Sequence, residues 1–492
     1  MSEPTSRRRL GVPAVTFMIV AASAPLTVLA GGVTTTFAVT GVLGVPLSFL
    51  ILGAALALFA VGYAAMSRFI VNAGAFYSYI SQGLGRPVGV GASLVALVAY
   101  NAMQVGIYGM FGYTVSDLLS TRLGVDIPWW IPVLVCVAIV AVLGMNRVDL
   151  SAKVLGVLVG LEFLVVIIYD IASFAVAPEG ANAVALAPSS LFTTGIGAVF
   201  AFGIAAFMGF ESAAIYSEES KDPKRTVARA TYTAVAIIAL FYAISSLAMT
   251  IGVGPSQTID TSRELGPSLI FQFLSGNLGV VVSDIAQLLF VTSLFASLVS
   301  FHNAVARYFF SLGREGVLPS GLARIGARSG APWAGSLAQT VIAVVVIIAF
   351  AIGGATWVPP EGLPAALFPV LTLFTWLTNA GAMGLVLLMA VISIAVIGFF
   401  RGDARGVGAW QRLVAPVVSF LALGTVFVLI IANFTVLLGQ AEPDATTYVL
   451  PAIILVPALI GIAWGLWLRA RRPTVYAQVG HGVEEEPVRL GE

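Results

Sequence analysis

The chain has 492 residues, of which 59% are hydrophobic and only 10% are charged, and its formal net charge is +1. Soluble proteins are about 45–50% apolar and about 25% charged, so this composition excludes a soluble enzyme, a nucleic-acid binder and a disordered protein. One cysteine and two histidines supply no disulfide framework, zinc site or haem site. We therefore expect an integral membrane protein that is not an enzyme and carries no cofactor.

Twelve apolar stretches are long enough to cross the ~30 Å hydrocarbon core as helices, which takes ~20 residues each. They lie at 12–39, 45–67, 88–119, 129–146, 152–177, 192–216, 228–252, 280–311, 335–353, 365–399, 412–438 and 447–469. The sequence around Ala22-Ser23-Ala24 imitates a signal-peptide cleavage site, but the apolar run continues past it, which indicates a retained first span. The predicted fold is an all-α, polytopic membrane protein with 12 transmembrane helices.

The distribution of positive charge orients these spans. With a cytoplasmic amino terminus, 22 of the 24 Lys and Arg residues fall in cytoplasmic segments, and the outer loops hold only Arg122 and Arg263. Lys and Arg are enriched in cytoplasmic loops. We expect a multi-pass protein of the plasma or inner membrane with a cytoplasmic amino terminus (1–11) and a cytoplasmic, disordered tail (470–492). The segments near 217–229 and 254–280 are expected to be the longest polar loops.

Two of the predicted spans are interrupted. Pro25 removes a backbone hydrogen bond in the middle of the first span, and Gly203 and Gly209 lie in the sixth. A proline kink and a glycine packing notch explain either break alone. Spans 1 and 6 lie five apart, however, and interrupted helices at matching positions of inverted repeats indicate the midplane site of a transporter. The prediction is therefore two inverted five-helix repeats and two further helices, at 12–177, 192–399 and 412–469.

An opened helix exposes amide N–H groups at the start of its second half and carbonyl groups at the end of its first. Pro25 suits the first position of the second half, where its missing N–H costs nothing, so the following amides are free to face an anion. Such a site fits a small zwitterion and needs no charged side chain. The residues expected around it are Ala22, Ser23, Ala24, Pro25, Leu26, Thr27, Ala205 and Gly209.

Two motifs resemble a known family. The run Gly209-Phe210-Glu211, with Glu218-Glu219-Ser220-Lys221-Asp222-Pro223 after it, resembles the span-6 signature of amino acid permeases of the amino acid–polyamine–organocation (APC) superfamily. The run Gly313-Arg314-Glu315-Gly316-Val317-Leu318-Pro319 resembles that family's motif after span 8. The resemblance covers nearly the whole chain and implies the LeuT-type fold. Where many members have G-x-G in span 1, this chain has Ser23-Ala24-Pro25-Leu26-Thr27.

The same resemblance implies further pocket residues. Phe207 and Phe301 occupy positions where the family places aromatic pocket or gate residues, and polar residues of spans 3 and 10 are candidates for selecting the substrate. These polar residues are Asn101, Gln104, Thr375 and Asn379. Packing between helices is the competing interpretation for all six residues.

Buried acids and hydroxyl groups are the candidates for ion coupling. Glu162 lies about ten residues into span 5, close to the midplane, where a carboxylate is expensive and by default functional. The alternative is a neutral glutamic acid hydrogen-bonded between helices. Glu211 is a candidate coupling residue or a helix cap. Thr292 and Ser293 resemble sodium ligands of this fold, although hydroxyls in membrane helices more often bond a preceding carbonyl.

Three other residues are expected to have structural roles only. Asp170 and Asp284 fall near outer span ends, where we expect solvated side chains, and His302 is expected to pack without a polar partner.

The sequence thus predicts a secondary active transporter that imports an amino acid or related amine by alternating access, coupled to protons or sodium ions. The alternatives are an exchanger that uses the same pocket and, from another class, a channel or a non-transporting membrane scaffold. A channel would repeat polar residues along several pore-lining spans, whereas here polarity concentrates at two breaks. The expected partners are the substrate, the coupling ion and membrane lipid, with no nucleic acid.

Overall fold

The computed structural model describes residues 11–70, 75–146, 152–210, 223–326, 329–359, 363–440 and 442–480. This part of the chain forms helices and turns and contains no β-strand. Glu211 and the acidic residues near the carboxyl terminus lie outside the described residues.

The longer helices follow the predicted apolar stretches closely. They are α3 (Val45–Met66), α5 (Arg86–Leu123), α6 (Trp130–Asn146), α7 (Ala152–Val176), α10 (Pro223–Val253), α13 (Val280–Arg314), α14 (Trp333–Gly354), α15 (Thr375–Phe400), α16 (Ala415–Ala432) and α18 (Ala445–Arg471).

Shorter helices and helical turns break or connect the long ones. They are α1 (Val12–Ala22), η1 (Thr27–Val33), α2 (Thr34–Thr40), α4 (Ala75–Leu84), η2 (Val184–Leu186), α8 (Pro188–Leu191), α9 (Ile196–Ala206), α11 (Thr258–Leu265), η4 (Gly266–Ser268), α12 (Leu269–Leu278), η5 (Ser320–Ala323), η6 (Ala365–Leu367), η7 (Val370–Phe374), η8 (Trp410–Val414), α17 (Phe434–Leu437) and α19 (Pro473–Gln478).

Nine helices in the described part of the chain are long and apolar enough to cross a membrane. Three further apolar helices, Thr27–Thr40, Trp130–Asn146 and Ile196–Ala206, are shorter. Two of the three belong to the interrupted spans, because each break leaves a half-helix in place of a full span. An all-helical, multi-pass membrane protein is therefore confirmed.

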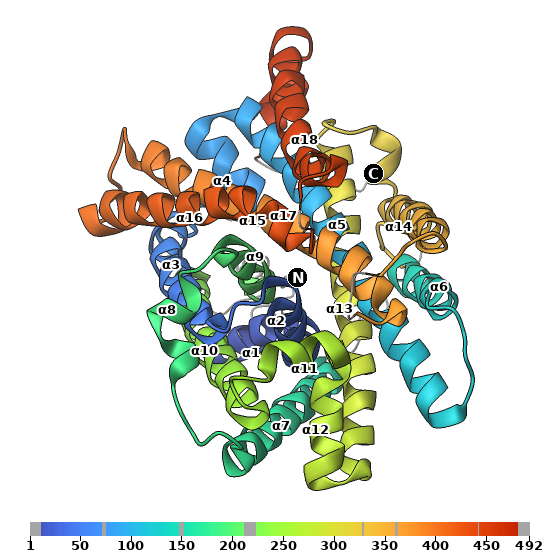
Figure 1. Cartoon of the computed structure of the whole chain (residues 1–492). Coiled ribbons are helices and arrows are strands. Elements are labelled where there is room, and N and C mark those ends of the chain that lie inside the picture. The colour runs from blue at the N-terminus through green and yellow to red at the C-terminus, as the bar shows by residue number, and fades with distance from the viewer. Residues whose placement is uncertain are drawn as a thin grey trace, which may run out of the picture.

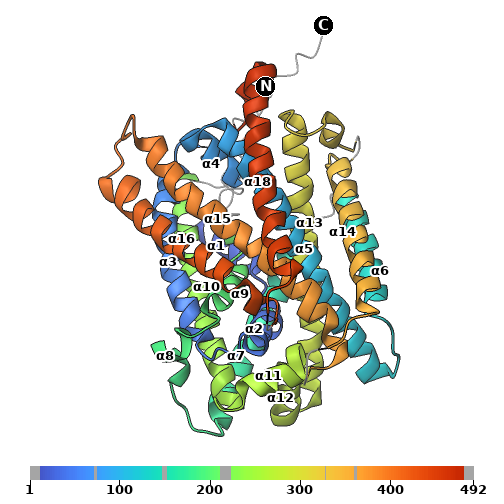
Figure 2. The ribbon, with the colours of Figure 1, turned by 45° about the horizontal axis from the view of Figure 1, so that its top comes forward.

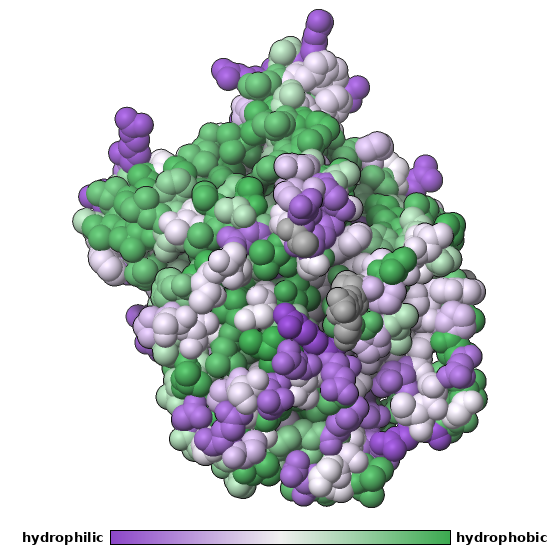
Figure 3. Space-filling view, viewed as in Figure 1, coloured by the Kyte–Doolittle hydropathy of each residue, from purple (hydrophilic) through white to green (hydrophobic). Residues whose placement is uncertain are grey.

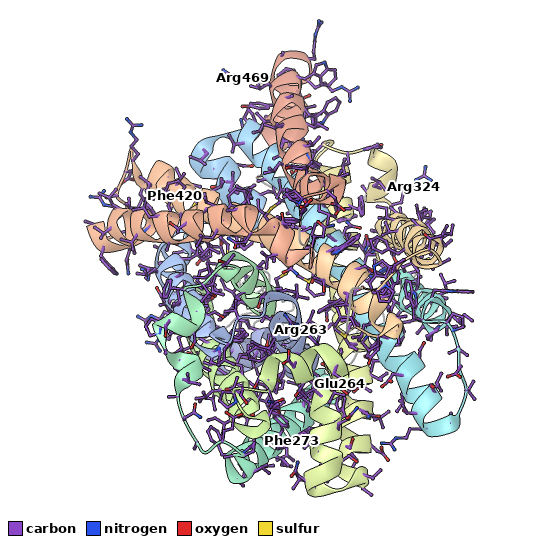
Figure 4. The ribbon with its side chains drawn as sticks, viewed as in Figure 1. Arg263, Glu264, Phe273, Arg324, Phe420 and Arg469 are labelled. Carbon is purple, nitrogen blue, oxygen red and sulfur yellow. The ribbon has the colours of Figure 1, made fainter. Side chains whose placement is uncertain are left out.

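The broken helices lie inside the bundle. In Figures 1 and 2, α1, α2 and α9 are surrounded by α3, α10, α13 and α15, whereas α16 and α18 lie at the periphery. Figure 3 shows apolar residues over the peripheral helices, in keeping with a lipid-facing surface. Hydrophilic residues gather over the lower centre of that view, where Arg263 and Glu264 of α11 lie (Figure 4).

Two features differ from the sequence-based expectation. The segment 254–280 is largely helical, because α12 buries Leu269, Ile270 and Phe271 against the bundle. The tail also begins with structure, since α19 follows α18 directly. Short helices of this kind combine apolar and polar residues within a few turns, so hydropathy averaged over a span-length window does not detect them.

Candidate functional site

The first span breaks at Ser23 and Ala24. Helix α1 ends at Ala22, and Ala24 adopts a left-handed conformation with φ +49°. The helix then resumes at once, because the Val28 amide donates to the Ala24 carbonyl over 3.0 Å. Pro25 therefore lies in the first turn of the second half-helix, where its ring costs no hydrogen bond. The predicted interruption of span 1 is confirmed.

The sixth span breaks after Ala206. The Phe207 amide donates to the Ile204 carbonyl over 3.0 Å, in place of the α-helical partner one residue earlier. Gly209 has φ +101°, a left-handed conformation that glycine adopts without steric cost. The predicted break at 205–209 is confirmed. The described segment ends one residue later, at Phe210.

A cavity lies between the two breaks. It is bounded by the first broken span and by α3, α5, α9, α13, η7 and α15. The lining residues are Ser23, Ala24, Thr27, Val28, Gly32, Val33, Thr36, Phe49, Met103, Ile107, Phe202, Ala205, Ala206, Met208, Ser297, Phe301, Phe374 and Thr378.

The wall of this cavity carries hydroxyl groups but no charged side chain among the described residues. Its aromatic rings and aliphatic side chains come from six helical elements, and its polar atoms come mainly from Ser23, Thr27, Thr36, Ser297 and Thr378. Small-molecule sites typically combine an apolar wall with a few polar groups. This cavity therefore suits a small molecule with an uncharged, apolar side chain.

Glu162 lies directly behind the break of span 1. Its side chain is 2% exposed, and its Oε2 accepts hydrogen bonds from the Ser293 hydroxyl over 2.8 Å and from the Leu26 amide over 3.4 Å. The Thr27 hydroxyl, in the cavity wall, is 3.1 Å from the Ser293 hydroxyl. The amide at the start of the half-helix therefore donates to a carboxyl oxygen that belongs to the protein, and this one carboxyl group joins three helical elements.

Ser23 makes a second junction at the break. Its hydroxyl donates to the Val20 carbonyl over 2.8 Å and is 2.9 Å from the Tyr242 hydroxyl of α10. The Tyr242 hydroxyl also lies 3.2 Å from the Ser23 carbonyl oxygen. The Val20 and Ser23 carbonyls thus have partners at a helix end that leaves such groups without helical ones.

Several predicted residues lie elsewhere. The Thr292 hydroxyl donates to the Leu289 carbonyl of its own helix over 2.9 Å, so Ser293 alone of this pair reaches Glu162. Phe207 lines a separate, smaller cavity with Phe210 and other apolar residues, and does not line the large one.

The polar residues expected to select the substrate are turned toward their own helices. Nδ2 of Asn101 donates to the Leu97 carbonyl over 2.8 Å, and Nδ2 of Asn379 donates to the Thr375 carbonyl over 2.7 Å. The Thr375 hydroxyl donates to the Val370 carbonyl over 2.7 Å. None of these three side chains lines the large cavity.

Gln104 belongs to a buried network between α5, α13 and α14. Its Nε2 is 3.3 Å from Nδ1 of His302, whose Nε2 is 2.6 Å from the Ser336 hydroxyl, and Gln339 donates to the Gln104 side-chain oxygen. Gln104 and Gln339 are fully buried. The expectation that His302 packs without a polar partner is therefore wrong, because its partner comes from a helix 34 residues away.

Asp170 is also placed differently from the expectation. It is only 8% exposed, and its Oδ2 accepts a hydrogen bond from the Ser245 hydroxyl over 2.7 Å. The prediction of a solvated end residue is wrong, because α10 covers this part of α7. Asp284 is exposed and pairs with Arg122.

Most of the apolar residues that line the cavity were not predicted from the sequence. Phe49, Met103, Ile107, Phe202 and Phe374 line the cavity without any local signal that separates them from ordinary packing residues. Large apolar side chains occur at nearly every position of these spans, so only the assembled fold shows which of them face the cavity.

A membrane bundle with two interrupted helices around one cavity, and a buried carboxyl group at the first interruption, has the architecture of a transporter. The family model described as amino acid permease matches residues 14–476. The chain belongs to the amino acid permease family, which is part of the APC superfamily.

Two relatives agree with this assignment, and one solved structure shares the fold. The chain is 26% identical over 323 residues to the branched-chain amino acid permease BcaP of Lactococcus lactis, covering 62% of this chain and 68% of that protein. It is 25% identical over 272 residues to the low-affinity putrescine importer PlaP of Escherichia coli K12, covering 53% and 57%. The fold resembles that of a manganese transporter of Eremococcus coleocola, with a TM-score of 0.53, 14% identity and 96% of each chain covered.

Proposed function

We propose that the protein is a secondary active transporter that imports a neutral, apolar amino acid by alternating access, with proton coupling through Glu162. The observation that carries this proposal is the position of the Glu162 carboxyl group, which binds the first free amide of the opened helix beside the cavity. The protonation of a carboxyl group in this position depends both on the substrate site and on the packing of the three helical elements that it joins.

The lining of the cavity supports a neutral amino acid. A zwitterion brings an ammonium and a carboxylate group, which backbone atoms of the two interrupted helices are suited to bind. Its side chain would then contact rings such as Phe202 and Phe301. A diamine such as putrescine carries two ammonium groups, and burying the second one without a carboxylate partner is costly. Branched-chain amino acids are therefore the first substrates to test.

Glu162 can couple a proton to this movement because its two states bond differently. The carboxylate only accepts hydrogen bonds, whereas the protonated acid also donates one. Protonation therefore weakens the acceptor interactions with the Ser293 hydroxyl and the Leu26 amide. That loosens the contact of α7 and α13 with the half-helix and allows the first span to move.

Sodium is the alternative coupling ion. The oxygen atoms of Glu162, Ser293 and Thr27 lie within hydrogen-bonding distance of one another in a chain, and a small hard cation takes oxygen ligands. We include Glu211 in the proposal as a coupling or capping residue from the sequence motif alone. The pocket proposal retains Ala22, Pro25 and Gly209 as residues at the two breaks.

The proposal includes the finer architecture. We propose 12 transmembrane helices, arranged as a 5+5 inverted repeat plus two carboxyl-terminal helices, in the plasma or inner membrane with both termini in the cytoplasm. The charge distribution of the sequence supports this orientation.

Uptake into proteoliposomes tests the function. Purified protein is reconstituted, and radiolabelled leucine, isoleucine, valine, glutamate, lysine and putrescine are offered with an imposed proton gradient, an imposed sodium gradient or neither. We expect concentrative uptake of the branched-chain amino acids under the proton gradient only. Uptake that follows the sodium gradient would identify sodium, and not the proton, as the coupling ion. Uptake that requires only unlabelled amino acid inside the vesicles would identify an exchanger. Failure of every substrate in every condition would overturn the proposed function.

A further inference from the structure

The segment that follows α18 folds back onto the bundle. It forms α19 and continues to Val479 and Gly480, at the end of the described residues. The Val479 side chain is completely buried, and Gly480 is buried as well. A chain end without a binding surface is usually exposed and poorly ordered, so this segment occupies a site on the protein.

The site is built around Glu315, the residue that follows α13. Glu315 is only 1% exposed; its Oε2 accepts a hydrogen bond from the Gly480 amide over 3.3 Å, and its Oε1 accepts one from the Tyr77 hydroxyl of α4 over 2.8 Å. The Arg86 guanidinium lies 5.2 Å from the centroid of the Tyr476 ring. Residues 473–480 are thus held to the start of α5 and to the residue after α13, and Gly480 packs against Ser81 of α4.

The hydrogen bond between Tyr77 and Glu315 has a defined direction. Burial and the neighbouring Glu315 carboxylate raise the pKa of Tyr77 well above its usual range, so the phenol remains protonated and donates. A buried carboxylate needs such donors, and the Gly480 amide supplies another. Removing residues 473–480 would therefore leave Glu315 with fewer donors and favour its exposure to water.

A column of aromatic rings connects this site to the cavity. Phe301, in the cavity wall, lies 6.2 Å from the Tyr100 ring, which lies 5.5 Å from the Tyr308 ring. The Tyr308 and Tyr77 rings are 6.4 Å apart, and Tyr77 reaches Glu315. Ring pairs at these separations attract one another. The column joins α4, α5 and α13 between the cavity and the end of the molecule that α19 covers.

We propose that residues 473–480 form a latch that holds this end of the transporter closed and must detach before the cavity opens toward it. The proposal rests on the proposed transport function, because alternating access requires the cavity to open on both sides in turn. The contact between the Tyr77 and Tyr308 rings separates when α4 moves away from α13. The latch donates a hydrogen bond to Glu315, after α13, and Gly480 packs against Ser81 of α4, so the latch contacts both sides and stabilises the closed arrangement.

A reversible cross-link tests the latch in the full chain. A Cβ atom built on Gly480 would lie 2.6 Å from the Cβ atom of Ser81 in α4, so a shift of about 1 Å brings the pair to disulfide geometry. The variant carries Ser81→Cys and Gly480→Cys in a Cys136→Ala background, which removes the only native cysteine. We expect oxidation to stop uptake and a reducing agent to restore it. Substrate binding, measured by calorimetry on the oxidised protein, should persist.

Two control variants show whether a loss of uptake comes from the cross-link or from the single substitutions and the oxidant. The single variants Ser81→Cys and Gly480→Cys receive the same oxidant, and the second reports the strain of a side chain at φ +78°. Their uptake should not respond to oxidation. If the double variant cross-links completely, as shown by mass spectrometry, and still transports at its reduced rate, the segment stays bound throughout the cycle and the latch proposal is wrong.

A shortened chain gives an independent test. A protein that ends at Arg472 lacks the latch but keeps all of α18. We expect its uptake to be several-fold faster and the amides of α4 to exchange hydrogen faster than in the full chain. Unchanged hydrogen exchange would overturn the latch even if the parent protein transports nothing. If the full-length protein transports nothing, the proposed function is overturned. The hydrogen-exchange measurement then decides on the latch by itself.

Discussion

Phe301 and Phe207 are two aromatic residues near the breaks that line different cavities. Phe301 lines the large cavity, whereas Phe207 lines the small one behind it. We expect Phe301→Ala to raise the dissociation constant of the substrate roughly tenfold or more, because the ring is part of the proposed binding wall. Calorimetric titration with a branched-chain amino acid measures this change.

Phe207→Ala is the matched control for Phe301→Ala. It removes the same ring from a site that is 1% exposed, so the melting temperature should fall while the affinity remains within about twofold. Equal losses of affinity in the two variants would show that both rings contribute to substrate binding. The assignment of the binding wall would then have to include Phe207.

The network around His302 makes a prediction about stability at a single residue. Ser336→Ala leaves the imidazole nitrogen of His302 without its partner at 2.6 Å in a buried site. An unsatisfied buried polar group costs about 1–3 kcal/mol. We therefore expect a lower denaturation midpoint in detergent. Ser300→Ala, which removes an exposed hydroxyl bonded to its own helix, should have almost no effect.

At the scale of elements, the break in span 1 imposes an unusual conformation on a residue with a side chain. Ala24 has φ +49°, which costs a non-glycine residue roughly 1 kcal/mol. Ala24→Gly should therefore raise the melting temperature. Ala201→Gly, within α9, should lower it, because glycine is unfavourable in a helix interior. A loss of stability in both variants would contradict the conformation assigned to Ala24.

The interruptions were predictable from sequence because proline and glycine act on the backbone locally. Pro25 and Gly209 each lie three residues after the position where the helix ends. The π-helical turn η7 was not predictable, because nothing in its apolar run distinguishes it from an α-helical turn. Helix α4 was missed because its mixed composition indicates no span.

At the scale of the whole molecule, the proposed orientation makes a topology prediction. In a Cys136→Ala background, Ser256→Cys and Asp403→Cys place single thiols at exposed positions of two connecting segments. A membrane-impermeant maleimide added to intact cells should label the first and label the second only after the membrane is opened. Labelling in the reverse pattern would invert the orientation, and labelling of both in intact cells would contradict the number of spans.

The sequence predicted the class of protein and the position of Glu162 better than the shape of the cavity. Composition and charge distribution reflect the lipid environment and so indicate a membrane protein. An acidic residue within an apolar span stands out in the sequence. Which faces of α5, α13 and α15 form the cavity depends on how the helices pack, and Gln104 shows the consequence. Its position in span 3 was correct, but it faces Gln339 and His302 and not the cavity.

The central claim is that Glu162 couples proton movement to transport, and Glu162→Gln in proteoliposomes tests it most directly. Glutamine keeps the shape of the protonated acid and cannot titrate. We predict that the variant binds substrate and exchanges labelled for unlabelled amino acid across the membrane as the parent does. It should fail to concentrate the amino acid when a pH gradient is imposed. Proton-driven accumulation that remains intact in Glu162→Gln would contradict the claim and leave Glu162 as a structural link between α7, α13 and the opened helix.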